Sequence, residues 1–324
     1  MHMKKIAVMT SGGDAPGMNA GIRAVTRTAL SLGLEVVGIY RGYQGMIEND
    51  FIPLSHESVR NIIHRGGTFL KTARSDDFRT IEGRAQAAAN LKAHGVEGLV
   101  VIGGDGSFTG AAALHDEHGV KVVGCPGTID NDLFGTDYTI GYDTAVNTAV
   151  HAIDQIRDTA ASHNRLFFVE VMGRDAGFIA LRTGLASGAE AVLVPETTTY
   201  IEDLTAKLEK NWKMKKSSAI IIVAEGDDAG GAIEIAKKVN AKFEGWESKV
   251  TVLGHIQRGG SPTAFDRILA SRMGHAAVLA LLAGSTDVMI GQKNGEMVEV
   301  PFKQAVKHHE TLSKHLLDLV EILS

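Results

Sequence analysis

Short apolar runs alternate with segments of helical periodicity along this chain. The runs at 98–102 and 219–224 are rich in valine and isoleucine, which is typical of strands buried on both faces of a sheet. At 18–32 and 143–161, apolar residues recur every three or four positions, which predicts amphipathic helices. The alternation therefore predicts an α/β protein, in which mostly parallel sheets carry helices on both faces.

The same alternation continues through the chain. The other strands are predicted at 6–9, 120–125, 166–171, 191–194 and 250–253. The other helices are predicted at 85–93, 107–117, 202–212, 231–243, 264–282 and 310–323. One doubly wound sheet with this many strands would be large, and no linker rich in proline or serine divides the sequence. We therefore expect two Rossmann-like lobes with a cleft between them, and a chain crossing near residue 140.

The amino-acid composition excludes several classes of function and location. The formal net charge is −5, so we expect no nucleic-acid partner. The sequence holds no apolar run of about eighteen residues and no signal-peptide pattern, so we expect no membrane association. The single cysteine, Cys125, excludes an intrachain disulfide framework and fits a reducing compartment, which predicts a cytoplasmic location.

Loops rich in glycine and aspartate follow three predicted strands, at Ser11–Asp14, Gly103–Ser107 and Pro126–Asp132. Glycine lets backbone N–H groups approach phosphate oxygens closely, while aspartate can hold Mg²⁺ or accept a proton. Ligands of parallel sheets bind beyond the carboxyl ends of the strands. The loops therefore predict a phosphate-and-metal cleft and phosphoryl transfer. Each loop alone also fits a tight turn, and the first carries neither a Walker A nor a Gly-x-Gly-x-x-Gly pattern.

Two carboxylates of the third loop, Asp130 and Asp132, are two positions apart. One could act as a base and the other as a metal partner, although an Asx-rich turn is the simpler alternative. Asp105 could meet Mg²⁺ at the end of its strand, or only cap the following helix.

Arginines at loops or element ends are candidate phosphate ligands, because guanidinium binds phosphate bidentately. Each alone is more typical of a surface ion pair. These arginines are Arg74, Arg165, Arg174 and Arg258. Arg23 and Arg27 lie four positions apart on the first predicted helix. The simpler interpretation is that both lie on a solvent-exposed face, and the alternative is that they form a second anion-binding site.

Long blocks of the chain, read in order, resemble the bacterial ATP-dependent 6-phosphofructokinases. The similarity runs from Lys4 to about Gly295. The matching blocks are TSGGDAPGMNA, RGGTFLKTARS, VVIGGDGS, PGTIDND, IRDTAASHNR, EVMGRDAG, VAEG, VLGHIQRGGSP and DRILASRMG. The resemblance implies a two-lobed α/β enzyme that transfers the γ-phosphoryl group of ATP to the 1-hydroxyl of fructose 6-phosphate, with Mg²⁺.

The resemblance implies a role for each matched residue. Asp130 corresponds to the base that takes the sugar hydroxyl proton, with Thr128 beside it, and Arg74 and Arg174 assist catalysis. Asp105 corresponds to the magnesium ligand, supported by Asp132. The implied nucleotide contacts are Gly13, Arg74, Ser75, Gly104, Asp105, Gly106 and Ser107. The implied sugar-phosphate contacts are Thr128, Ile129, Asp130, Arg165, Met172, Gly173, Arg174, Glu225, Lys249, His255, Ile256, Gln257 and Arg258.

The family's architecture implies a division and an assembly. The larger, nucleotide-binding lobe would comprise 1–141 and 257–304, and the smaller, sugar-phosphate-binding lobe 142–256 and 305–324. Such enzymes are usually homotetramers. Arg165 corresponds to an arginine that crosses a subunit interface, so the active site would be complete only in an oligomer.

An effector site for ADP or phosphoenolpyruvate between subunits is also implied. Its matched positions are Arg23, Arg27, Arg157, Gly188, Glu190, Met214, Lys216 and Ser218. His56, Met214 and Ser218 replace an arginine, a lysine and a histidine of the family, so we expect reduced or altered allosteric control. Lys249 replaces a second cross-subunit arginine, which predicts weaker sugar-phosphate affinity.

The phosphoryl donor leaves an alternative within the family. Pyrophosphate-dependent relatives tend to carry aspartate where Gly106 stands and lysine where Gly127 stands, so glycine at both positions favours ATP. NAD and lipid kinases share Gly-Gly-Asp-Gly turns, but they are not expected to share the PGTIDND and GHIQR blocks. A non-catalytic nucleotide sensor is a further alternative, although it would have no need of a base at Asp130.

Overall fold

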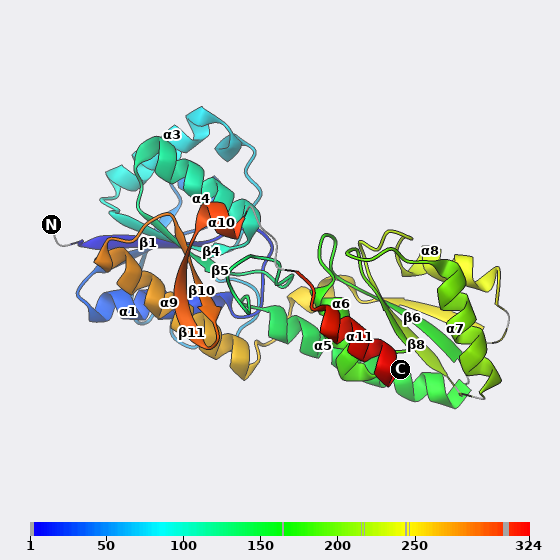
Figure 1. The fold of residues 1–324 in the computed structure, drawn as a ribbon. Coiled ribbons are helices and arrows are strands. Elements are labelled where there is room, and N and C mark those ends of the chain that lie inside the picture. Colours follow the sequence, from blue (N-terminus) through cyan, green and yellow to red (C-terminus); the bar gives the residue numbers. More distant parts are fainter. Residues whose placement is uncertain are drawn as a thin grey trace. The chain divides into compact units, whose positions relative to one another are not determined.

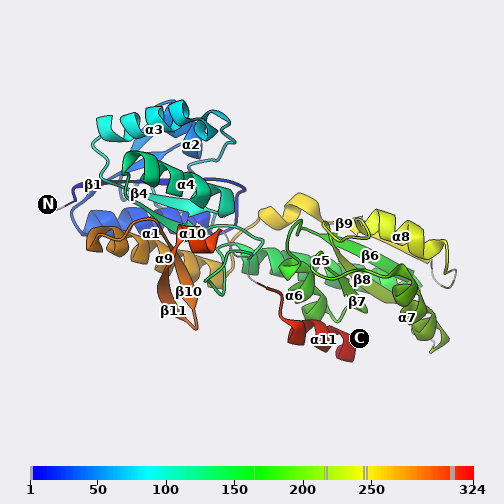
Figure 2. The ribbon, with the colours of Figure 1, turned by 45° about the horizontal axis from the view of Figure 1, so that its top comes forward.

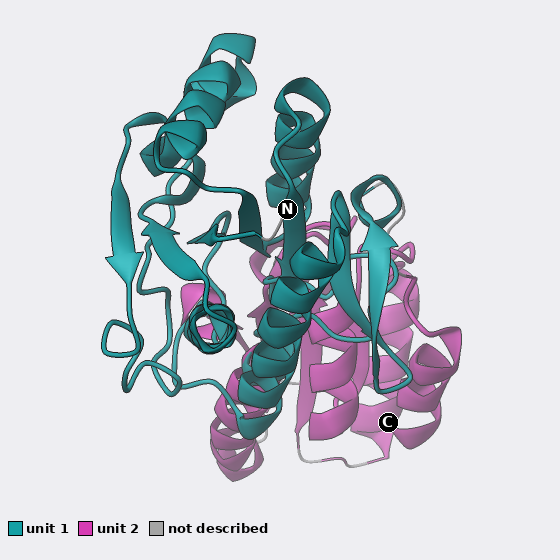
Figure 3. Cartoon of the chain, turned by 90° about the vertical axis from the view of Figure 1, so that its left-hand side faces the viewer, with its two compact units in different colours: residues 1–144, 258–310 teal, residues 145–257, 311–324 magenta. Residues whose placement is uncertain are grey.

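The structure is a computed structural model, and it describes residues 3–163, 165–214, 216, 218–243, 245, 247–306 and 311–324. The chain forms two compact units, coloured separately in Figure 3. Unit 1 comprises Met1–Thr144 with Arg258–Glu310, and unit 2 comprises Ala145–Gln257 with Thr311–Ser324. The sequence analysis put these divisions at 141, 256 and 304.

Unit 1 is built on a seven-stranded sheet of order β11-β10-β5-β4-β1-β2-β3. Its strands are β1 (Lys5–Thr10), β2 (Glu35–Ile39), β3 (Phe51–Leu54), β4 (Gly98–Gly103), β5 (Val122–Pro126), β10 (Val288–Lys293) and β11 (Glu296–Pro301). The five inner strands are parallel, while β3 and β11 pair antiparallel at the two edges. The sequence analysis did not predict β2, β3, β10 and β11, because glycine, proline or polar residues interrupt their apolar runs.

Helices cover both faces of this sheet (Figures 1 and 2). They are α1 (Met18–Ser31), α2 (Gly42–Ile47), α3 (Ile81–Ala93), α4 (Asp105–His118), α9 (Ala264–Ala283) and α10 (Phe302–Ala305), with the 3₁₀ turn η1 (Asp77–Arg79). Helices α1 and α9 pack against each other on one face, and α3 and α4 lie on the other. The prediction of a mostly parallel α/β fold is confirmed.

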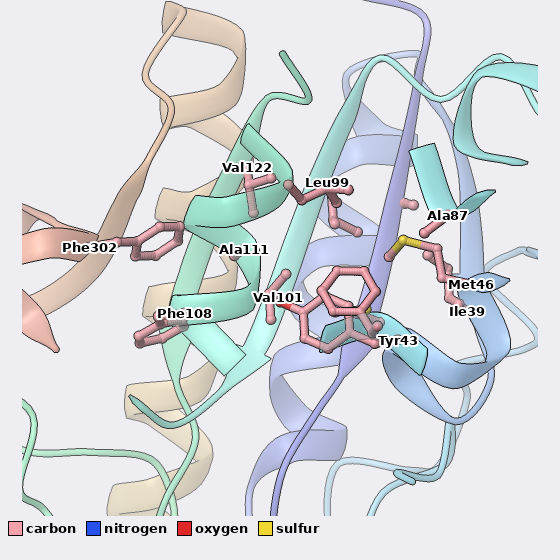
Figure 4. Packing of buried hydrophobic residues seen from close by; sticks show 14 of the residues in the cluster. Ile39, Tyr43, Met46, Ala87, Leu99, Val101, Phe108, Ala111, Val122 and Phe302 are labelled. Atoms are coloured by element: carbon pink, nitrogen blue, oxygen red, sulfur yellow. The ribbon is translucent and has the colours of Figure 1, made fainter. Parts of the chain in front are cut away.

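The core between β4 and α4 sets the spacing of the loops that follow them (Figure 4). Phe108 of α4 stacks on Phe302 of α10 with ring centroids 4.9 Å apart, and both side chains are fully buried. A Cβ atom on Gly124 of β5 would lie 2.4 Å from the Phe108 ring, so only glycine fits beneath it. Burying each phenylalanine contributes roughly 1.5–3 kcal/mol, which fixes α4 against the sheet.

Unit 2 is built on a four-stranded parallel sheet of order β7-β8-β6-β9. Its strands are β6 (Arg165–Val171), β7 (Ala191–Leu193), β8 (Ala219–Ala224) and β9 (Glu247–Val252). Its helices are α5 (Tyr142–His163), which begins in unit 1, α6 (Phe178–Ser187), α7 (Ile201–Lys213), α8 (Ala232–Asn240) and α11 (Lys314–Leu323), and the 3₁₀ turn η2 (Gly254–Arg258) follows β9. Helices α7 and α8 cover one face of the sheet, and α6 and α11 pack together on the other (Figure 2).

Helix α11 begins later than the predicted helix 310–323. Ser313 caps it, because its hydroxyl accepts the N–H of Leu316 at 3.4 Å. Residue 310 of the prediction lies outside the described residues. In the part of the chain that the structure describes, no helix is both long and apolar enough to span a bilayer.

Candidate active site

Three loops of unit 1 leave the carboxyl ends of neighbouring strands. Strands β1, β4 and β5 are adjacent in the sheet, so the loops that follow them meet at one edge. The first loop is joined to β4 by a hydrogen bond from the Ser11 N–H to the Ile102 carbonyl at 3.0 Å. The third is joined to it by a bond from the Gly127 N–H to the Gly103 carbonyl at 2.9 Å. The structure therefore brings the three predicted loops together.

Close packing between the loops requires glycine. A Cβ atom on Gly103 would lie 2.4 Å from Ser107 Oγ and 2.6 Å from the Ser11 carbonyl. A Cβ on Gly13 would lie 2.5 Å from Nη1 of Arg258, so this guanidinium rests directly on the first loop. Gly106 differs, because among the described residues, its chain neighbours and the nearby backbone of α4 aside, no atom lies within 4 Å of where its Cβ would be.

Helix α4 begins in the second loop at a glycine, which has no side chain to cap the first amide groups. Gly104 occupies its N-cap position, and Asp105 and Gly106 are exposed while Ser107 is buried. Helices α6 and α8 also follow glycines, but carboxylates cap them: Glu196 accepts the Gly177 N–H and Glu170 accepts the Ala232 N–H, both at 2.8 Å. The start of α4 therefore presents N–H groups and a helix dipole suited to a phosphate.

The third loop holds Asp130 in a local hydrogen-bond network. The Thr128 hydroxyl accepts the Asp130 N–H at 3.3 Å and donates to the Asp130 carboxylate at 3.4 Å. Buried Asn131 has a left-handed backbone with φ 54°, and its Oδ1 accepts the Thr139 N–H at 2.7 Å. The Thr139 hydroxyl donates to the Thr128 carbonyl at 2.6 Å. Through these hydrogen bonds, the segment 136–140 holds the third loop in place.

The sequence analysis gave Asn131 and Thr139 no role of their own. Asparagine in a turn between two aspartates was the available signal, because asparagine tolerates positive φ better than other side chains. Of the predicted substrate contacts in this loop, Ile129 is fully buried, so its side chain belongs to the core. Asp132 is half-buried.

Arg74 and Ser75 precede η1. Arg74 is exposed and makes no hydrogen bond or ion pair with any residue that the structure describes, so its guanidinium is available to a ligand. The Ser75 hydroxyl donates to Gln44 Oε1 at 2.7 Å and accepts the Phe78 N–H at 3.2 Å. Ser75 thus already organises the turn that carries Arg74.

A second cluster lies in unit 2 at the carboxyl ends of β6 and β8 and in η2. Buried Gln257 accepts the Met172 N–H on its Oε1 at 3.3 Å. The Gly226 N–H donates to the Gly173 carbonyl at 3.1 Å, and a Cβ on Gly226 would lie 1.8 Å from the Arg174 carbonyl. The structure therefore brings together Met172, Gly173, Arg174, Glu225, His255, Ile256 and Gln257 within this unit. Of these, Arg174, Glu225, His255 and Ile256 are exposed.

Arg165 and Lys249 do not join that cluster within one chain. Arg165 begins β6, seven residues before Met172, which is about 23 Å along an extended strand. Both cations instead contact Glu247 at the start of β9, Arg165 at 3.0 Å and Lys249 at 2.5 Å. The ammonium of Lys249, followed by the Arg165 guanidinium, holds the pKa of Glu247 below its ordinary value.

The predicted effector residues form separate groups in the two units. In unit 2, Arg157 donates to the Ser187 and Gly188 carbonyls, and Lys216 contacts Glu190 at 2.9 Å. Met214 is exposed and Ser218 half-buried. In unit 1, Arg23 and Arg27 of α1 are half-buried rather than on a solvated face, and Arg27 Nε is buried with no hydrogen-bond partner among the described residues. Burial, with the nearby Arg27 charge, lowers the pKa of Arg23.

Comparison with known proteins decides the family. The family model described as phosphofructokinase matches residues 5–281. This chain belongs to the phosphofructokinase family. It is 59% identical to an ATP-dependent 6-phosphofructokinase 1 of Thermus thermophilus, over 99% of this chain and 100% of that protein. It is 52% identical to an ATP-dependent 6-phosphofructokinase 2 of Bacteroides thetaiotaomicron, over 99% of each chain. The resemblance predicted from the motifs is confirmed.

Solved structures of other phosphofructokinases share the fold. A phosphofructokinase from Saccharomyces cerevisiae superposes with a TM-score of 0.88 at 39% identity, over 94% of this chain and 45% of the yeast chain. A pyrophosphate-dependent phosphofructokinase from Marinobacter aquaeolei superposes with a TM-score of 0.85 over 98% of this chain and 91% of that one. Its identity is only 22%, so this second likeness concerns the fold alone.

Proposed function

We propose that this protein transfers the γ-phosphoryl group of ATP to the 1-hydroxyl of fructose 6-phosphate, giving fructose 1,6-bisphosphate and ADP, as a step of glycolysis. The observation that carries the proposal is the 59% identity, across 99% of the chain, to a protein named ATP-dependent 6-phosphofructokinase. The three loops of unit 1 supply the groups that this reaction needs.

The donor side consists of the first two loops. Gly13, Gly104, Gly106 and Ser107 contact the phosphates of ATP through backbone N–H groups and the hydroxyl, aided by the dipole of α4. Arg74 stabilises the negative charge on the transferring group, since its guanidinium is exposed and has no protein partner among the described residues.

The acceptor side is the third loop. Asp130 accepts the proton of the sugar hydroxyl as that oxygen forms its bond to the γ-phosphorus, while the bond from phosphorus to the bridging oxygen of ADP breaks. The Thr128 hydroxyl donates to the Asp130 carboxylate at 3.4 Å and so helps to orient it. A carboxylate is a weak base, but positioning and charge neutralisation supply most of the acceleration in phosphoryl transfer.

Asp105 and Asp132 are the proposed supports for Mg²⁺. In the described residues no three side chains of histidine, cysteine, aspartate or glutamate gather as a complete metal site. That fits Mg²⁺, which is usually held by one or two carboxylates together with substrate phosphates and water. When bound, the ion neutralises charge on the phosphate oxygens.

The sugar-phosphate side draws on unit 2 and on a second copy of the chain. Met172, Gly173, Arg174, Glu225, His255 and Gln257 bind the sugar phosphate, as does Arg258 of unit 1. Arg165 lies at the other end of its strand, about 23 Å from Met172, and Lys249 contacts the same Glu247 as Arg165, so we propose that both serve the site of a neighbouring subunit. A homotetramer with shared active sites accounts for both placements.

Regulation and location complete the proposal. ADP and phosphoenolpyruvate are the proposed effectors, bound by Arg23, Arg27, Arg157, Glu190 and Lys216. Because Met214 and Ser218 carry no positive charge, we expect weaker anion binding than in relatives. The proposed location is the cytoplasm, where glycolysis takes place and where reducing conditions keep a thiol such as that of Cys125 free.

ATP rather than pyrophosphate is the proposed donor because of the space beside Gly106. Outside its chain neighbours and the nearby backbone of α4, no described atom lies within 4 Å of its Cβ position, so an adenosine phosphate chain could pass there. Gly127 is more restricted, because a Cβ would lie 3.0 Å from Ile102 Cγ2 and 3.1 Å from Met18 Cε.

A coupled assay of purified protein with fructose 6-phosphate and either ATP or pyrophosphate tests the function. We expect turnover with ATP and Mg²⁺ at a rate typical of kinases, about 1–100 s⁻¹, and little with pyrophosphate. Turnover with pyrophosphate alone would reverse the choice of donor. No turnover with either donor would reject the function.

A further inference from the structure

Helix α5 begins at a residue that cannot cap it. Gly141 immediately precedes the helix, has no side chain and holds φ at 103°. A Cβ there would lie 2.7 Å from Ala15 Cβ, so a side chain that could cap the helix does not fit. The first N–H groups of α5 therefore need an acceptor from elsewhere in the fold.

Asp266 of α9 supplies that acceptor from 122 or more residues away in sequence. Its Oδ1 accepts the Gly141 N–H at 2.9 Å. Its Oδ2 accepts the Thr144 N–H at 2.8 Å and the Thr144 hydroxyl at 2.6 Å. Asp266 is fully buried, so all of these bonds are shielded from water.

The starts of α5 and α9 are linked by further bonds around this carboxylate. Thr263 caps α9, because its hydroxyl accepts the Asp266 N–H at 3.2 Å, and the same hydroxyl donates to Asp143 at 2.6 Å. The Thr263 N–H donates to the Thr144 hydroxyl at 3.0 Å. Four side chains thus tie residues 141–144 to residues 263–266.

These linked residues contact the loops of the site in unit 1. Next to Gly141, the Ile140 N–H donates to the Pro126 carbonyl at 2.8 Å, directly before the loop that carries Asp130. A Cβ on Gly17, at the end of the first loop, would lie 2.7 Å from Ile140 and 3.5 Å from Asp266. Thr263 follows Arg258, whose guanidinium rests on Gly13, by only five residues. The carboxylate therefore lies where the base loop, the first phosphate loop and the Arg258 segment converge.

We propose that Asp266 is a positioning residue for phosphoryl transfer: by capping α5 from α9, it fixes the segment that supports Asp130. It touches neither substrate, and its effect passes through Gly141, Ile140 and Thr139 to the loop. The inference rests on the proposed function for its kinetic readout.

Asp266→Asn tests the proposal. Asparagine keeps one acceptor oxygen, but its amide NH₂ then faces a backbone N–H donor, so the cap is half lost. We expect kcat to fall about 10- to 100-fold, because a displaced base loses near-attack geometry, while KM for ATP changes less than about threefold. We also expect faster amide hydrogen exchange in residues 128–141.

Thr144→Val is the second variant, in case Asp266→Asn folds poorly. It removes the hydroxyl that donates to Asp266 and accepts the Thr263 N–H, but it leaves both backbone bonds to Asp266, so we expect a smaller loss of kcat, about 3- to 10-fold. Thr80→Ala is the matched control. Thr80 caps α3 by accepting the Gly83 N–H at 3.0 Å, so this variant loses a helix cap in the same unit.

The outcomes separate the inference from the function. Loss of kcat in Asp266→Asn and Thr144→Val, but not in Thr80→Ala, supports positioning. Equal losses in all three, or none in the first two, overturn it, since the effect would then be one of general stability. If the wild type shows no kinase activity, the proposed function fails. Amide hydrogen exchange in residues 128–141 still tests the inference in that case. If exchange is unchanged in both Asp266→Asn and Thr144→Val, the inference is rejected.

Discussion

Three glycines of the candidate site occupy positions where any side chain would meet a neighbour. A Cβ atom on Gly103 would lie 2.4 Å from Ser107 Oγ, and one on Gly226 would lie 1.8 Å from the Arg174 carbonyl. The Arg258 head group that approaches Gly13 is the end of a flexible side chain and could move, whereas the carbonyl at Gly226 is fixed backbone. We therefore infer that Gly226 sets the path of the chain at the sugar-phosphate cluster more rigidly than Gly13 sets the first loop.

Asp130→Asn removes the proposed base and keeps its size. We expect kcat to fall by about a hundredfold to ten-thousandfold, the usual contribution of a general base, while the affinity for nucleotide changes little. Steady-state kinetics and calorimetric titration with an ATP analogue measure the two quantities. Asp132→Asn is the comparison variant, because Asp132 is a proposed support for Mg²⁺ on the nucleotide. If Asp130→Asn lost as much nucleotide affinity as Asp132→Asn, residue 130 would belong to the donor side instead.

Lys249→Arg introduces the planar fork that the family resemblance implies at this position for binding the sugar phosphate. Because guanidinium binds phosphate bidentately and ammonium does not, we expect KM for fructose 6-phosphate to fall roughly threefold or more. Lys249→Gln, which removes the charge, should raise it. An unchanged or higher KM in Lys249→Arg, measured at saturating ATP, rejects the role of residue 249.

At the scale of elements, several helices are capped at their N-termini by carboxylates that lie elsewhere in the sequence. Glu196 serves α6, Glu170 serves α8 and Asp266 serves α5, and each carboxylate lies outside the helix that it caps. At α4 the N-cap residue is Gly104, which has no side chain and so supplies no cap of its own. The first residue of α4 is Asp105, the carboxylate that we propose as a support for Mg²⁺.

The buried cap of α5 predicts a pH dependence of stability. Burial raises the pKa of Asp266 to about 6, against the hydrogen bonds from Thr144 and Gly141 that lower it. The folded protein therefore holds this proton at a higher pH than the unfolded chain, so the associated stability is present below pH 4 and is lost as the pH rises toward 6. The change is on the order of 3 kcal/mol.

Urea unfolding between pH 4 and pH 7 measures this effect. The free energy of unfolding of the wild type relative to Asp266→Asn should decrease as the pH rises, because asparagine does not titrate. Thr80→Ala, whose cap carries no charge, should keep a constant difference from the wild type over the same range. A constant difference for Asp266→Asn as well would mean that the carboxyl titrates alike in both states.

At the scale of the whole molecule, the proposed active site needs two chains. Arg165 and Lys249 gather around Glu247 at the amino ends of β6 and β9, while the other sugar-phosphate residues of unit 2 lie at the carboxyl ends. The length of β6 separates Arg165 from Met172, so we propose that Arg165 contacts a ligand bound to another copy of the chain.

Mixing two inactive variants tests the shared site. Asp130→Asn lacks the base and Arg165→Ala lacks the donated arginine, so each homotetramer should be nearly inactive. In hybrids, some sites combine an intact Asp130 with an intact Arg165, and random assembly should restore about a quarter of wild-type activity. The variants are unfolded and refolded together, with each refolded alone as the control. Hybrids that form and stay inactive would falsify the shared site.

The amino-acid sequence by itself determined the fold class, the family and the loops of the site. Buried parallel strands need continuous apolar runs, and phosphate loops need glycine, so both leave a local pattern such as 98–106 that can be read without a structure. The short edge strands β3 and β11 left no such pattern, because one face or one edge of each meets solvent and polar residues are tolerated there.

Only the tertiary structure decided which residues support the site from a distance. Nothing in the neighbourhood of Asp266 in the sequence points to Gly141, since their hydrogen bond exists only because α9 and α5 start at the same place in the fold. Likewise Arg165 and Met172 are near in sequence but stand at opposite ends of a strand, whose extended backbone carries them apart. Periodicity and composition act over a few residues, whereas caps and shared sites depend on distances in space.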